Sequence, residues 1–521
     1  MRAPVSTPDV LSSIIDQART GPDHPAVKDL EVELSYAQLL ERVAHVGAGL
    51  TARGVREGDR VALLLPNSVD FVVAALASMW IGAIFVPLAV TDPEIRLATI
   101  VGDCAATLVV TSHAREDDAA PASLAGAAMV AISALDAAPG PPSEPIYAAR
   151  RVAYAIYTSG TTGTPKGVQI SNVAFAAAVS ATAAALGLDR DTRTLCVSPF
   201  YFDGSFGTLF PTLYCGGAVV IRPRDALLFP RTFFHAVVDE AITYTGFSPS
   251  YLRLLLSSPM MSSLGDSRLE LIALGGEASS LADIRSLWEL APNVRVFNRY
   301  GPTETTIAVT HVHLTPEITA DGRVPMGYPH PGVVFYLVAT DGTIIDGSHE
   351  VGELYVGGAQ LMDGYWGDAL SENVLRTDVV AGETLYRTGD LVFRDVSGSY
   401  VYVDRADRVI KRSGVRISLI ELSDVIGGLS DVSAAACVTF DDEGELGIVA
   451  FVVSDHAIAA HDLWRAARER LPDSMLPNRI EQVDSLPLNK SNKLDEQLLL
   501  SGAGLRAPRS DSANVPLFPP A

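Results

Sequence analysis

The stretch that most constrains this chain covers residues 157–168 and reads YTSGTTGTPKGV. Its twelve positions hold three Gly, four Thr, one Ser and one Lys. The apolar run VAYAIYT leads into it and the short run GVQI ends it, and both have the composition of β-strands. A strand–loop–strand of this kind offers backbone N–H groups, hydroxyl donors and one cation, because glycines let the backbone approach a ligand closely. Those groups are the ones that a polyphosphate requires.

Two other interpretations of this stretch are weaker. The P-loop motif places Ser or Thr directly after its Gly-Lys pair, whereas Lys166 stands between Pro165 and Gly167. A flexible polar hairpin is what Gly- and Thr-rich composition alone usually indicates. The length and order of this string disfavour that interpretation.

The chain is long, acidic and of ordinary globular composition. Its 521 residues exceed what one hydrophobic core organises, so we expect two or more domains. A net charge of −22 disfavours nucleic acid as a partner, because proteins that bind nucleic acid carry basic patches. The four cysteines form no CxxC pair, so no disulfide framework or zinc site is indicated and a reducing cytoplasm is expected. The N-terminal residues contain no apolar core typical of a signal peptide.

One uncharged segment, residues 71–90, is long enough to cross a bilayer. Gly82 and Pro87 interrupt it, and no Lys or Arg flanks it closely. We therefore predict a buried helix to about Trp80, a turn at Gly82 and a short strand AIFVPL inside a folded core. No association with a membrane is expected.

Helical and strand patterns alternate along the chain, which indicates an α/β architecture. Residues 34–55 have helical periodicity, with Ser35 as the N-cap and Gly54 as the stop signal. The runs DRVALLLPN and TLVVTS are typical of strands, and NVAFAAAVSATAAAL is typical of a helix. Residues 113–150 are rich in Ala and Pro with little periodicity, so we expect a surface connection there.

Several further stretches, in a fixed order, carry a resemblance to a known family. They are SPFYFDGSFGTLF (198–210), LIALGGEAS (271–279), FNRYGPTETT (297–306), VGELYVGG (351–358), YRTGD (386–390), YVDRADRVIKRSGVRI (402–417), LPDSMLP (471–477) and LPLNKSNKLD (486–495). With the loop at 157–168 they resemble the adenylate-forming superfamily, which covers amino-acid adenylation domains, acyl-CoA ligases and luciferases. The resemblance implies a large, multi-subdomain α/β adenylation core at 1–403 and a small, mobile α+β domain at 404–500, joined by a hinge. We expect residues 501–521 to form a disordered tail.

The resemblance implies that the chain activates a carboxylate with ATP, a reaction in which positioning and charge neutralisation dominate. It implies that Lys166 is catalytic and holds phosphates, that Glu304 is catalytic and a ligand of Mg²⁺, and that Asp390 accepts the ribose hydroxyls. Tyr300 and Asn298 would address adenine, by stacking and through the exocyclic amine respectively. The residues implied to bind ATP are Thr158, Ser159, Gly160, Thr161, Thr162, Gly163, Lys166, Gly275, Gly276, Glu277, Asn298, Tyr300, Gly301, Thr303, Asp390, Tyr402, Arg405 and Lys411.

Two residues of the small domain complete the implied machinery. Lys493 matches the catalytic lysine that reaches the substrate carboxylate, a task suited to a mobile point charge. The family usually reads Asn-Gly-Lys there, whereas this chain reads Ser491-Asn492-Lys493. Asn tolerates the left-handed backbone nearly as well as Gly, so we expect function to survive. Asp407 matches the hinge residue about which the small domain rotates.

The resemblance also locates a substrate pocket, in which Asp203 would pair with a substrate ammonium. Arg299 is unusual there, because the family more often has a small or apolar residue just before Tyr300. A buried guanidinium needs an anion and matches a carboxylate, so we predict an acidic, aspartate-type amino acid with an α- or β-amine. The alternative, in which Arg299 turns outward to a surface acid, stays open. The implied pocket residues are Asp203, Gly204, Gly207, Gly246, Ile272, Leu274, Arg299, Ile307 and Ala308.

Three functional hypotheses follow. The leading one is an amino acid–carrier protein ligase of the nonribosomal-peptide type, which forms aminoacyl-AMP and loads the phosphopantetheine thiol of a separate carrier protein. No carrier domain is recognised after residue 500, so we expect a freestanding enzyme. An acyl-CoA ligase for a non-amino acid is disfavoured by Asp203, because a buried carboxylate without a cationic partner is costly. A degenerate nucleotide-binding regulator is disfavoured by Lys166, Glu304, Asp390 and Lys493.

Overall fold

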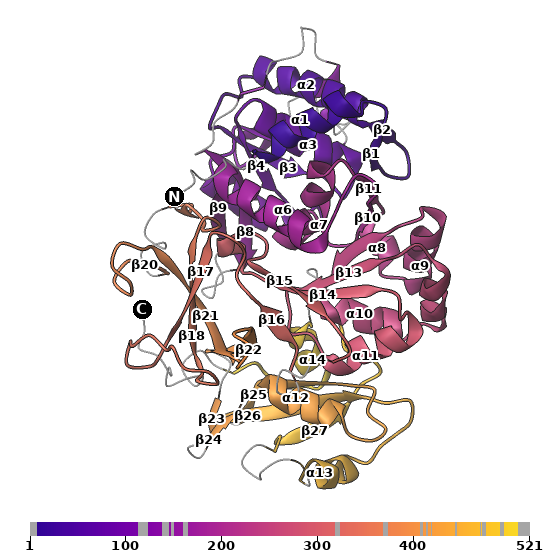
Figure 1. Cartoon of the computed structure of the whole chain (residues 1–521), viewed down its shortest axis with the longest axis vertical. Coiled ribbons are helices and arrows are strands. Elements are labelled where there is room, and N and C mark those ends of the chain that lie inside the picture. The colour runs from indigo at the N-terminus through magenta and orange to yellow at the C-terminus, as the bar shows by residue number, and fades with distance from the viewer. Residues whose placement is uncertain are drawn as a thin grey trace.

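The chain folds into five β-sheets with helices packed between and around them, within the part that the structure describes (Figure 1). The computed structural model describes residues 8–112, 123–137, 145–146, 151–159, 165–317, 323–367, 374–406, 410–412, 415–417, 419–442, 445–468, 470, 476–489 and 494–508. Strands and helices alternate along most of the sequence, as the periodicity predicts. The predicted α/β class is therefore confirmed.

The first large sheet contains the strands on both sides of the Gly/Thr-rich loop. Its strand order is β19-β9-β8-β4-β3-β5-β7-β6. The loop strands β8 and β9 pair antiparallel, with Thr158 opposite Lys166, so the predicted strand–loop–strand is a hairpin. The strands are β3 (Arg60–Leu64), β4 (Ile84–Pro87), β5 (Leu108–Thr111), β6 (Ser123–Leu124), β7 (Ala127–Ala131), β8 (Val152–Ser159), β9 (Pro165–Ser171) and β19 (Gly364–Tyr365).

The second large sheet carries the strands that lead into the site. Its strand order is β15-β14-β13-β12-β10-β11-β1-β2, and β10 to β14 run parallel. The residues of β11, β12 and β13 are buried on both faces of the sheet, as is typical of parallel strands. The strands are β1 (Pro25–Lys28), β2 (Glu33–Ser35), β10 (Arg193–Cys196), β11 (Ala218–Ile221), β12 (Tyr244–Phe247), β13 (Leu271–Gly275), β14 (Arg295–Tyr300) and β15 (Thr310–Leu314).

One layer of helices packs between the two large sheets. The main hydrophobic core combines residues of α1, α2, α3, α6 and α7 with strand residues of both sheets, such as Phe85 of β4 and Val219 of β11. A second core lies on the other face of the β10–β15 sheet, under α9, α10 and α11. The helices of this region are α1 (Val10–Thr20), α2 (Tyr36–Ala52), α3 (Val69–Trp80), α4 (Glu94–Asp103), α5 (Ile132–Asp136), α6 (Asn172–Leu186), α7 (Asp203–Tyr214), α8 (Arg224–Leu227), α9 (Pro230–Asp239), α10 (Pro249–Leu256) and α11 (Leu281–Leu290), with the 3₁₀ turns η1 (Pro259–Asp266) and η2 (Thr303–Thr305).

A third, antiparallel sheet brings Asp390 to the site. Its strands are β16 (Pro325–Gly327), β17 (Val333–Val338), β18 (Gly352–Gly358), β20 (Leu375–Arg376), β21 (Leu385–Arg394) and β22 (Tyr400–Arg405). Gly389 and Asp390, the last two residues of the YRTGD motif, both lie inside β21. Gly389 has a φ of 72° where the pairing of β21 with β18 shifts register, so it forms a bulge that redirects the strand.

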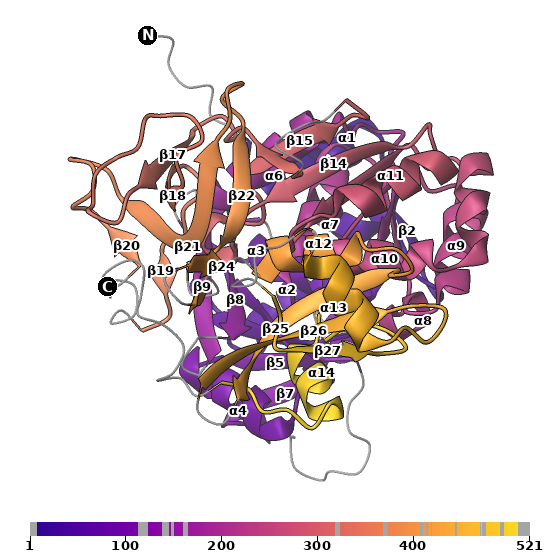
Figure 2. The same ribbon diagram turned by 90° about the horizontal axis from the view of Figure 1, so that it is seen from below.

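The small C-terminal unit packs against the end of the molecule that holds the site (Figures 1 and 2). It comprises β23 (Ile410–Arg412), β24 (Val415–Ile417), α12 (Leu419–Gly427), β25 (Ala434–Asp442), β26 (Glu445–Val453), α13 (Ala460–Arg468), β27 (Arg479–Gln482) and α14 (Glu496–Gly502). The strand β22 runs through residues 403 and 404, so any connection between the two parts begins after Arg405. At the other end, Leu505 still packs on the core formed with β25 and α14, beyond the predicted end at residue 500.

Several local predictions can be checked directly. Ser35 caps α2, and its capping box with Gln38 explains where that helix begins. The uncharged segment 71–90 forms all of α3 after its first two residues, a turn at Gly82 with φ 72°, and β4. Its part of α3 is buried, as predicted. Within the described residues, no helix combines the length and apolarity that a membrane crossing needs.

The prediction of a plain surface connection over residues 113–150 is wrong in part. β7 extends the first sheet by pairing parallel with β5, and Ile132 and Leu135 of α5 are buried in the main core. The sequence of β7 and α5 is rich in Ala, so its apolar and polar positions differ little in hydrophobicity. The periodicity was therefore too weak to predict a strand and a helix there.

Candidate active site

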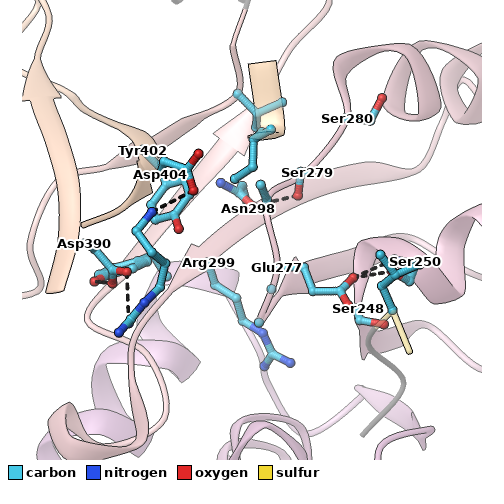
Figure 3. Close-up of a pocket in the computed structure, with 18 of the residues that line it drawn as sticks. Ser248, Ser250, Glu277, Ser279, Ser280, Asn298, Arg299, Asp390, Tyr402 and Asp404 are labelled. Carbon is cyan, nitrogen blue, oxygen red and sulfur yellow. Dashed lines mark hydrogen bonds and ion pairs between the residues drawn. The ribbon is translucent and has the colours of Figure 1, made fainter. Parts of the chain in front are cut away.

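A cavity of about 610 Å³ lies at the carboxyl ends of β13 and β14, between the second sheet, the third sheet and the small C-terminal unit. Its wall includes Asp203 and Arg299 from the large part, Asp390 and Tyr402 from the third sheet, and Ser423 from α12. Figure 3 shows these walls converging, with Arg299 projecting from β14 into the space between them. Clefts at the carboxyl ends of parallel strands are the usual ligand sites of open α/β sheets.

One wall of the cavity presents a carboxylate held by two partners. The Tyr300 hydroxyl donates to Oδ2 of Asp390, and Nη1 of Arg405 donates to Oδ1 at 3.3 Å. Burial and the neighbouring Asp390 raise the pKa of Tyr300 well above its ordinary value, so the phenol keeps its proton and donates. The Asp390 side chain is buried and fixed in direction. This arrangement brings together three residues that the sequence assigns to the nucleotide.

The turn between β13 and α11 forms the opposite wall. Gly276 has a φ of 85°, a backbone conformation that favours glycine, and a Cβ on Gly275 would lie 2.4 Å from Cγ of Arg299. Both polar atoms of the Asn298 amide have a partner, because Oδ1 accepts from Ser279 at 3.0 Å and Nδ2 donates to the Pro325 carbonyl at 2.8 Å. The Asn298 amide therefore braces the wall, and only a remaining lone pair of Oδ1 can meet the exocyclic amine assigned to it.

Glu277 also lines the cavity, but its carboxylate is already occupied. Its Oε2 accepts from the backbone N–H of Ser250 at 3.0 Å and from the Ser250 hydroxyl at 2.5 Å (Figure 3). Ser250 lies in the first turn of α10, whose N-terminus favours a negative charge. The structure thus gives Glu277 a role in fixing α10 against the β13–α11 turn.

A third group, next to the hairpin, contains the two charged residues assigned to phosphate and metal. Lys166 is the second residue of β9, after Pro165, and its Nζ lies 5.5 Å from the centre of the Tyr365 ring. Glu304 lies in η2 after Thr303, and its Oε1 accepts from the Tyr365 hydroxyl at 2.7 Å. Thr303 lines the cavity, whereas Lys166 and Glu304 are not among its lining residues. One tyrosine therefore contacts both the predicted phosphate cation and the predicted metal ligand.

The innermost part of the site contains one acidic and one basic side chain. Asp203 begins α7 and is buried, and Arg299 is 7% exposed on the facing strand β14. Nη2 of Arg299 donates to the carbonyl of Gly204 at 3.3 Å, while Nη1 is buried with no hydrogen-bond partner in the described part of the chain. A Cβ on Gly207 would lie 2.8 Å from that Nη1, so the glycine leaves room for the guanidinium. Arg299 therefore points inward, and the alternative of an outward, surface-paired Arg299 is wrong.

Comparison with known proteins decides the family. Residues 14–366 match the AMP-binding enzyme family, and residues 421–493 match the AMP-binding enzyme C-terminal domain. The chain belongs to the AMP-binding enzyme family. The predicted resemblance to adenylate-forming enzymes and the predicted fold are thereby confirmed.

Individual relatives of this AMP-binding chain include multidomain synthetases. It is 30% identical over 494 residues to tyrocidine synthase 3 of Brevibacillus parabrevis, which covers 93% of this chain and only 7% of that protein. Its fold is similar to a four-domain nonribosomal peptide synthetase bound to AMP and glycine (24% identity, TM-score 0.83, 94% of this chain and 36% of that chain). It is similar also to o-succinylbenzoate CoA synthetase of Bacillus subtilis with an acyl-adenylate (24% identity, TM-score 0.78, 94% and 97% of the two chains). At these identities the two structures show the fold alone.

Two of the predicted pocket residues of this AMP-binding chain are wrong by one position. Ile272 and Leu274 are fully buried in the core under α9–α11, on the face of β13 that is turned away from Arg299. The pairing of β13 with β14 places Gly275 opposite Arg299 and Ala273 opposite Phe297, so those residues share the face of the Arg299 side chain. A shift of one residue along a strand exchanges the two faces, which explains the error.

The other predicted pocket residues lie around Arg299 or behind it. Ile307 borders the cavity. A Cβ on Gly246 would meet the Thr208 hydroxyl at 2.9 Å, next to the helix that carries Gly207. Ala308 is buried in the main core beside Gly301, where a Cβ on that glycine would lie 2.5 Å from Cα of Ala308. Ala308 thus supports the loop after Glu304 and does not line the cavity.

Several predicted site residues lie outside the described residues. They are Gly160, Thr161, Thr162 and Gly163 of the hairpin loop, the hinge residue Asp407 and the catalytic Lys493. The backbone of Ser159 ends β8 and that of Lys411 lies in β23, but their side chains are outside the description. The roles of these residues stay predictions.

The structure also shows how the loop of residues 304–308 is held, through contacts with residues that the sequence did not single out. Thr306 and Ile307 have positive φ values of 61° and 69°, and Nε2 of the buried Gln360 donates to the carbonyls of Thr306 at 3.3 Å and Ala308 at 2.7 Å. Oε1 of Gln360 in turn contacts Nδ1 of His330 at 2.9 Å. The stretch GAQLMDGYW carries no charge pattern except one Asp, so only tertiary contact identifies Gln360 and Tyr365 as parts of the site.

Proposed function

We propose that this chain activates an amino acid with ATP, forming aminoacyl-AMP and releasing pyrophosphate, and then transfers the aminoacyl group to the phosphopantetheine thiol of a carrier protein. One observation carries the proposal most directly. Asp203 and Arg299 are buried together at the end of the same cavity that the held carboxylate of Asp390 borders. A substrate with an ammonium and two carboxylates would meet a complementary charge at Asp203 and at Arg299.

The preferred substrate in this proposal is an acidic amino acid of the aspartate type. A buried guanidinium nitrogen without a hydrogen-bond acceptor is costly, and Nη1 of Arg299 is such a group within the described residues. A carboxylate beside Nη1 would supply the missing acceptor in the geometry that a guanidinium fork prefers. The second carboxylate of the substrate then remains free to react. Whether the amine is α or β to that carboxylate is left open.

In the proposed reaction, an oxygen of the substrate carboxylate attacks the α-phosphorus of ATP and pyrophosphate leaves. Asp390, held by Tyr300 and Arg405, would accept the ribose hydroxyls. Lys166 would neutralise phosphate charge, and Lys493 would approach the reacting carboxylate. Positioning and charge neutralisation are the main means of catalysis in such displacements.

The residues present fit a magnesium ion carried by the nucleotide. Mg²⁺ typically takes one or two carboxylates plus phosphate oxygens and waters, and Glu304 offers Oε2 beside the hydrogen-bonded Oε1. Within the described residues, no group of three His, Cys, Asp or Glu side chains is arranged to hold a metal by itself. When bound, Mg²⁺ supplies charge neutralisation of the phosphates.

The experiment that tests the proposal is ATP–pyrophosphate exchange with a panel of amino acids and fatty acids. We expect exchange with aspartate-type substrates, and a loss of about 2–5 kcal/mol in kcat/KM for them in Arg299→Ala, as for truncation of one member of a buried charge pair. Exchange with small neutral amino acids should change little in that variant. A wild-type preference for leucine- or phenylalanine-like substrates over every dicarboxylic one would refute the substrate assignment and leave the enzyme class intact.

The acceptor is tested separately. With ATP and its amino acid, the protein should accumulate bound adenylate and discharge it onto an added holo-carrier protein. Efficient transfer to free coenzyme A without a preference for the carrier would support an acyl-CoA ligase instead.

A further inference from the structure

Tyr365 occupies a position that the backbone fixes firmly. It forms the short strand β19, which pairs antiparallel with β9 so that Tyr365 lies opposite Val168. Nε2 of Gln169 donates to the Tyr365 carbonyl at 3.2 Å, and the next residue, Trp366, donates its N–H to the Gly167 carbonyl at 2.7 Å. Only 4% of Tyr365 is exposed. Its ring is therefore held against the strand that leaves the Gly/Thr-rich loop.

The side chain of Tyr365 contacts both charged residues of the phosphate region. Its hydroxyl donates to Oε1 of Glu304 at 2.7 Å, and Nζ of Lys166 lies 5.5 Å from its ring centre. The hydroxyl is the donor in this hydrogen bond, because an ionised carboxylate can only accept. The face of a tyrosine ring attracts a cation at this separation.

The two charged residues have no other ionic partner here. No ion pair of Lys166 or Glu304 is present among the described residues, and Oε2 of Glu304 has no hydrogen bond there. Lys166 lies over the face of the Tyr365 ring, and Glu304 accepts from the hydroxyl at the edge of that ring. A lysine and a glutamate attract each other strongly if they meet in a partly buried place. Direct pairing would occupy the cation and the carboxylate that the proposed reaction needs for phosphate and metal.

We propose that Tyr365 is a positioning residue that aims the Glu304 carboxylate at the magnesium ion of MgATP and keeps Lys166 from pairing with it. The inference rests on the proposed function and adds a residue to it. The hydroxyl and the ring have separable tasks: the hydroxyl fixes Glu304, and the ring separates the two charges. Tyr365→Phe removes the first task, and Tyr365→Leu removes both.

The decisive measurement is the calorimetric binding of ATP to the full chain, with Mg²⁺ and with EDTA. Loss of a hydrogen bond to a charged group typically amounts to about tenfold in an equilibrium constant, so we expect about tenfold weaker MgATP binding in Tyr365→Phe. Metal-free ATP should bind Tyr365→Phe and wild type equally, because the task proposed for the hydroxyl is to fix the carboxylate that faces the metal. In Tyr365→Leu, metal-free ATP should also bind more weakly, because Lys166 is then free to pair with Glu304.

A matched control and a double variant separate this role from a structural one. Tyr336→Phe removes a tyrosine-to-carboxylate hydrogen bond of similar length, 3.0 Å to Glu383, on the third sheet and should leave both affinities unchanged. Glu304→Gln with Tyr365→Phe should bind MgATP no more weakly than Glu304→Gln alone.

Three results would overturn the inference: equal weakening with and without Mg²⁺ in Tyr365→Phe, unchanged MgATP affinity, or additive effects in the double variant. Failure of the wild-type chain to bind ATP at all would refute the proposed function itself, and the inference with it.

Discussion

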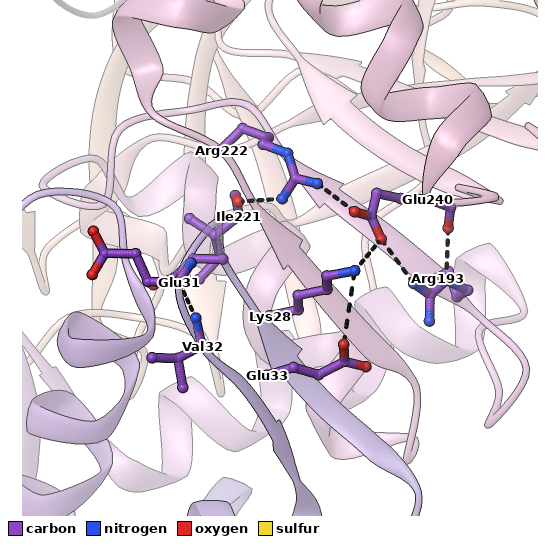
Figure 4. Close-up of polar contacts among 9 residues, drawn as sticks. Lys28, Glu31, Val32, Glu33, Arg193, Ile221, Arg222 and Glu240 are labelled. Carbon is purple, nitrogen blue, oxygen red and sulfur yellow. Dashed lines mark hydrogen bonds and ion pairs between the residues drawn. The ribbon is translucent and has the colours of Figure 1, made fainter.

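Glu240 offers a direct test of what holds the second sheet together. It lies at the C-terminal end of α9, and its carboxylate pairs with three basic side chains from three neighbouring strand segments (Figure 4). Its Oε2 accepts from Nζ of Lys28 at 3.0 Å and from Nη2 of Arg193 at 3.4 Å, and its Oε1 accepts from Nη2 of Arg222. The Glu240 carbonyl also accepts from Nε of Arg193 at 2.8 Å. The perturbation we choose is Glu240→Gln, which keeps the shape and removes the charge.

The expected cost follows from the exposure of the partners. The Glu240 and Arg222 side chains are only 11% and 12% exposed, whereas Arg193 and Lys28 are 28% and 33% exposed. Removing one member of a buried ion pair costs about 3–5 kcal/mol, while an exposed pair contributes about 0–1 kcal/mol. Solvent screens the charges of Arg193 and Lys28, which are the more exposed partners. In addition, the glutamine of the variant can still accept a hydrogen bond. We therefore expect Glu240→Gln to lower the free energy of unfolding by about 2–3 kcal/mol.

The same cluster predicts a dependence on pH. Burial alone would raise the pKa of Glu240, but its hydrogen bonds to Lys28 and Arg222 outweigh burial and leave that pKa below its ordinary value. A carboxyl group with a lowered pKa stabilises the fold fully above its unfolded-state pKa, about 4.3 for Glu. This stabilisation is lost as the pH falls from there through the folded-state pKa. The stability difference between wild type and Glu240→Gln should thus shrink on the acid side of about pH 4.3.

The assay is urea unfolding followed by tryptophan fluorescence at neutral and acid pH. Asp16→Asn is the control, because Asp16 forms an exposed ion pair with Arg19 and should shift the midpoint negligibly. A loss below about 1 kcal/mol for Glu240→Gln at neutral pH would refute the reasoning, since it would make the cluster equivalent to a surface pair. A loss that did not change with pH would refute the ionic explanation alone.

Two further predictions concern the site. Lys493→Ala should abolish adenylate formation while ATP still binds; pyrophosphate exchange that stays within about tenfold of wild type, about 1.4 kcal/mol in barrier, would contradict the catalytic assignment. Gly207→Ala should displace the Arg299 guanidinium, because the new Cβ would lie 2.8 Å from Nη1 and 2.6 Å from Cγ2 of Ile307, and should lower kcat/KM for dicarboxylic substrates more than for neutral ones. Gly204→Ala is the matched control in the same helix, since its Cβ would lie at an ordinary 3.9 Å from Nη2; equal effects of the two variants would refute this prediction.

Local physical chemistry was enough to predict much of this protein from its sequence. The capping box of Ser35 places the start of α2, and Gly82 divides the uncharged segment into α3 and β4, because each acts on backbone a few residues away. The same holds for the β8–β9 hairpin around the Gly/Thr-rich loop. The ordered series of short motifs then indicated the AMP-binding family, and with it an Asp, an Arg and a set of glycines around one pocket.

The tertiary structure decided the rest, because it depends on register and on contacts between distant segments. Which face of β13 meets Arg299 is set by its pairing with β14, so Ile272 and Leu274 proved to be core residues. Arg299 faces inward because Gly207 leaves space for its guanidinium, which no local pattern around Arg299 reveals. Tyr365 joins Lys166 and Glu304 although it is far from both in sequence. A side chain with an ordinary local pattern becomes part of a site only when the fold brings its partners to it.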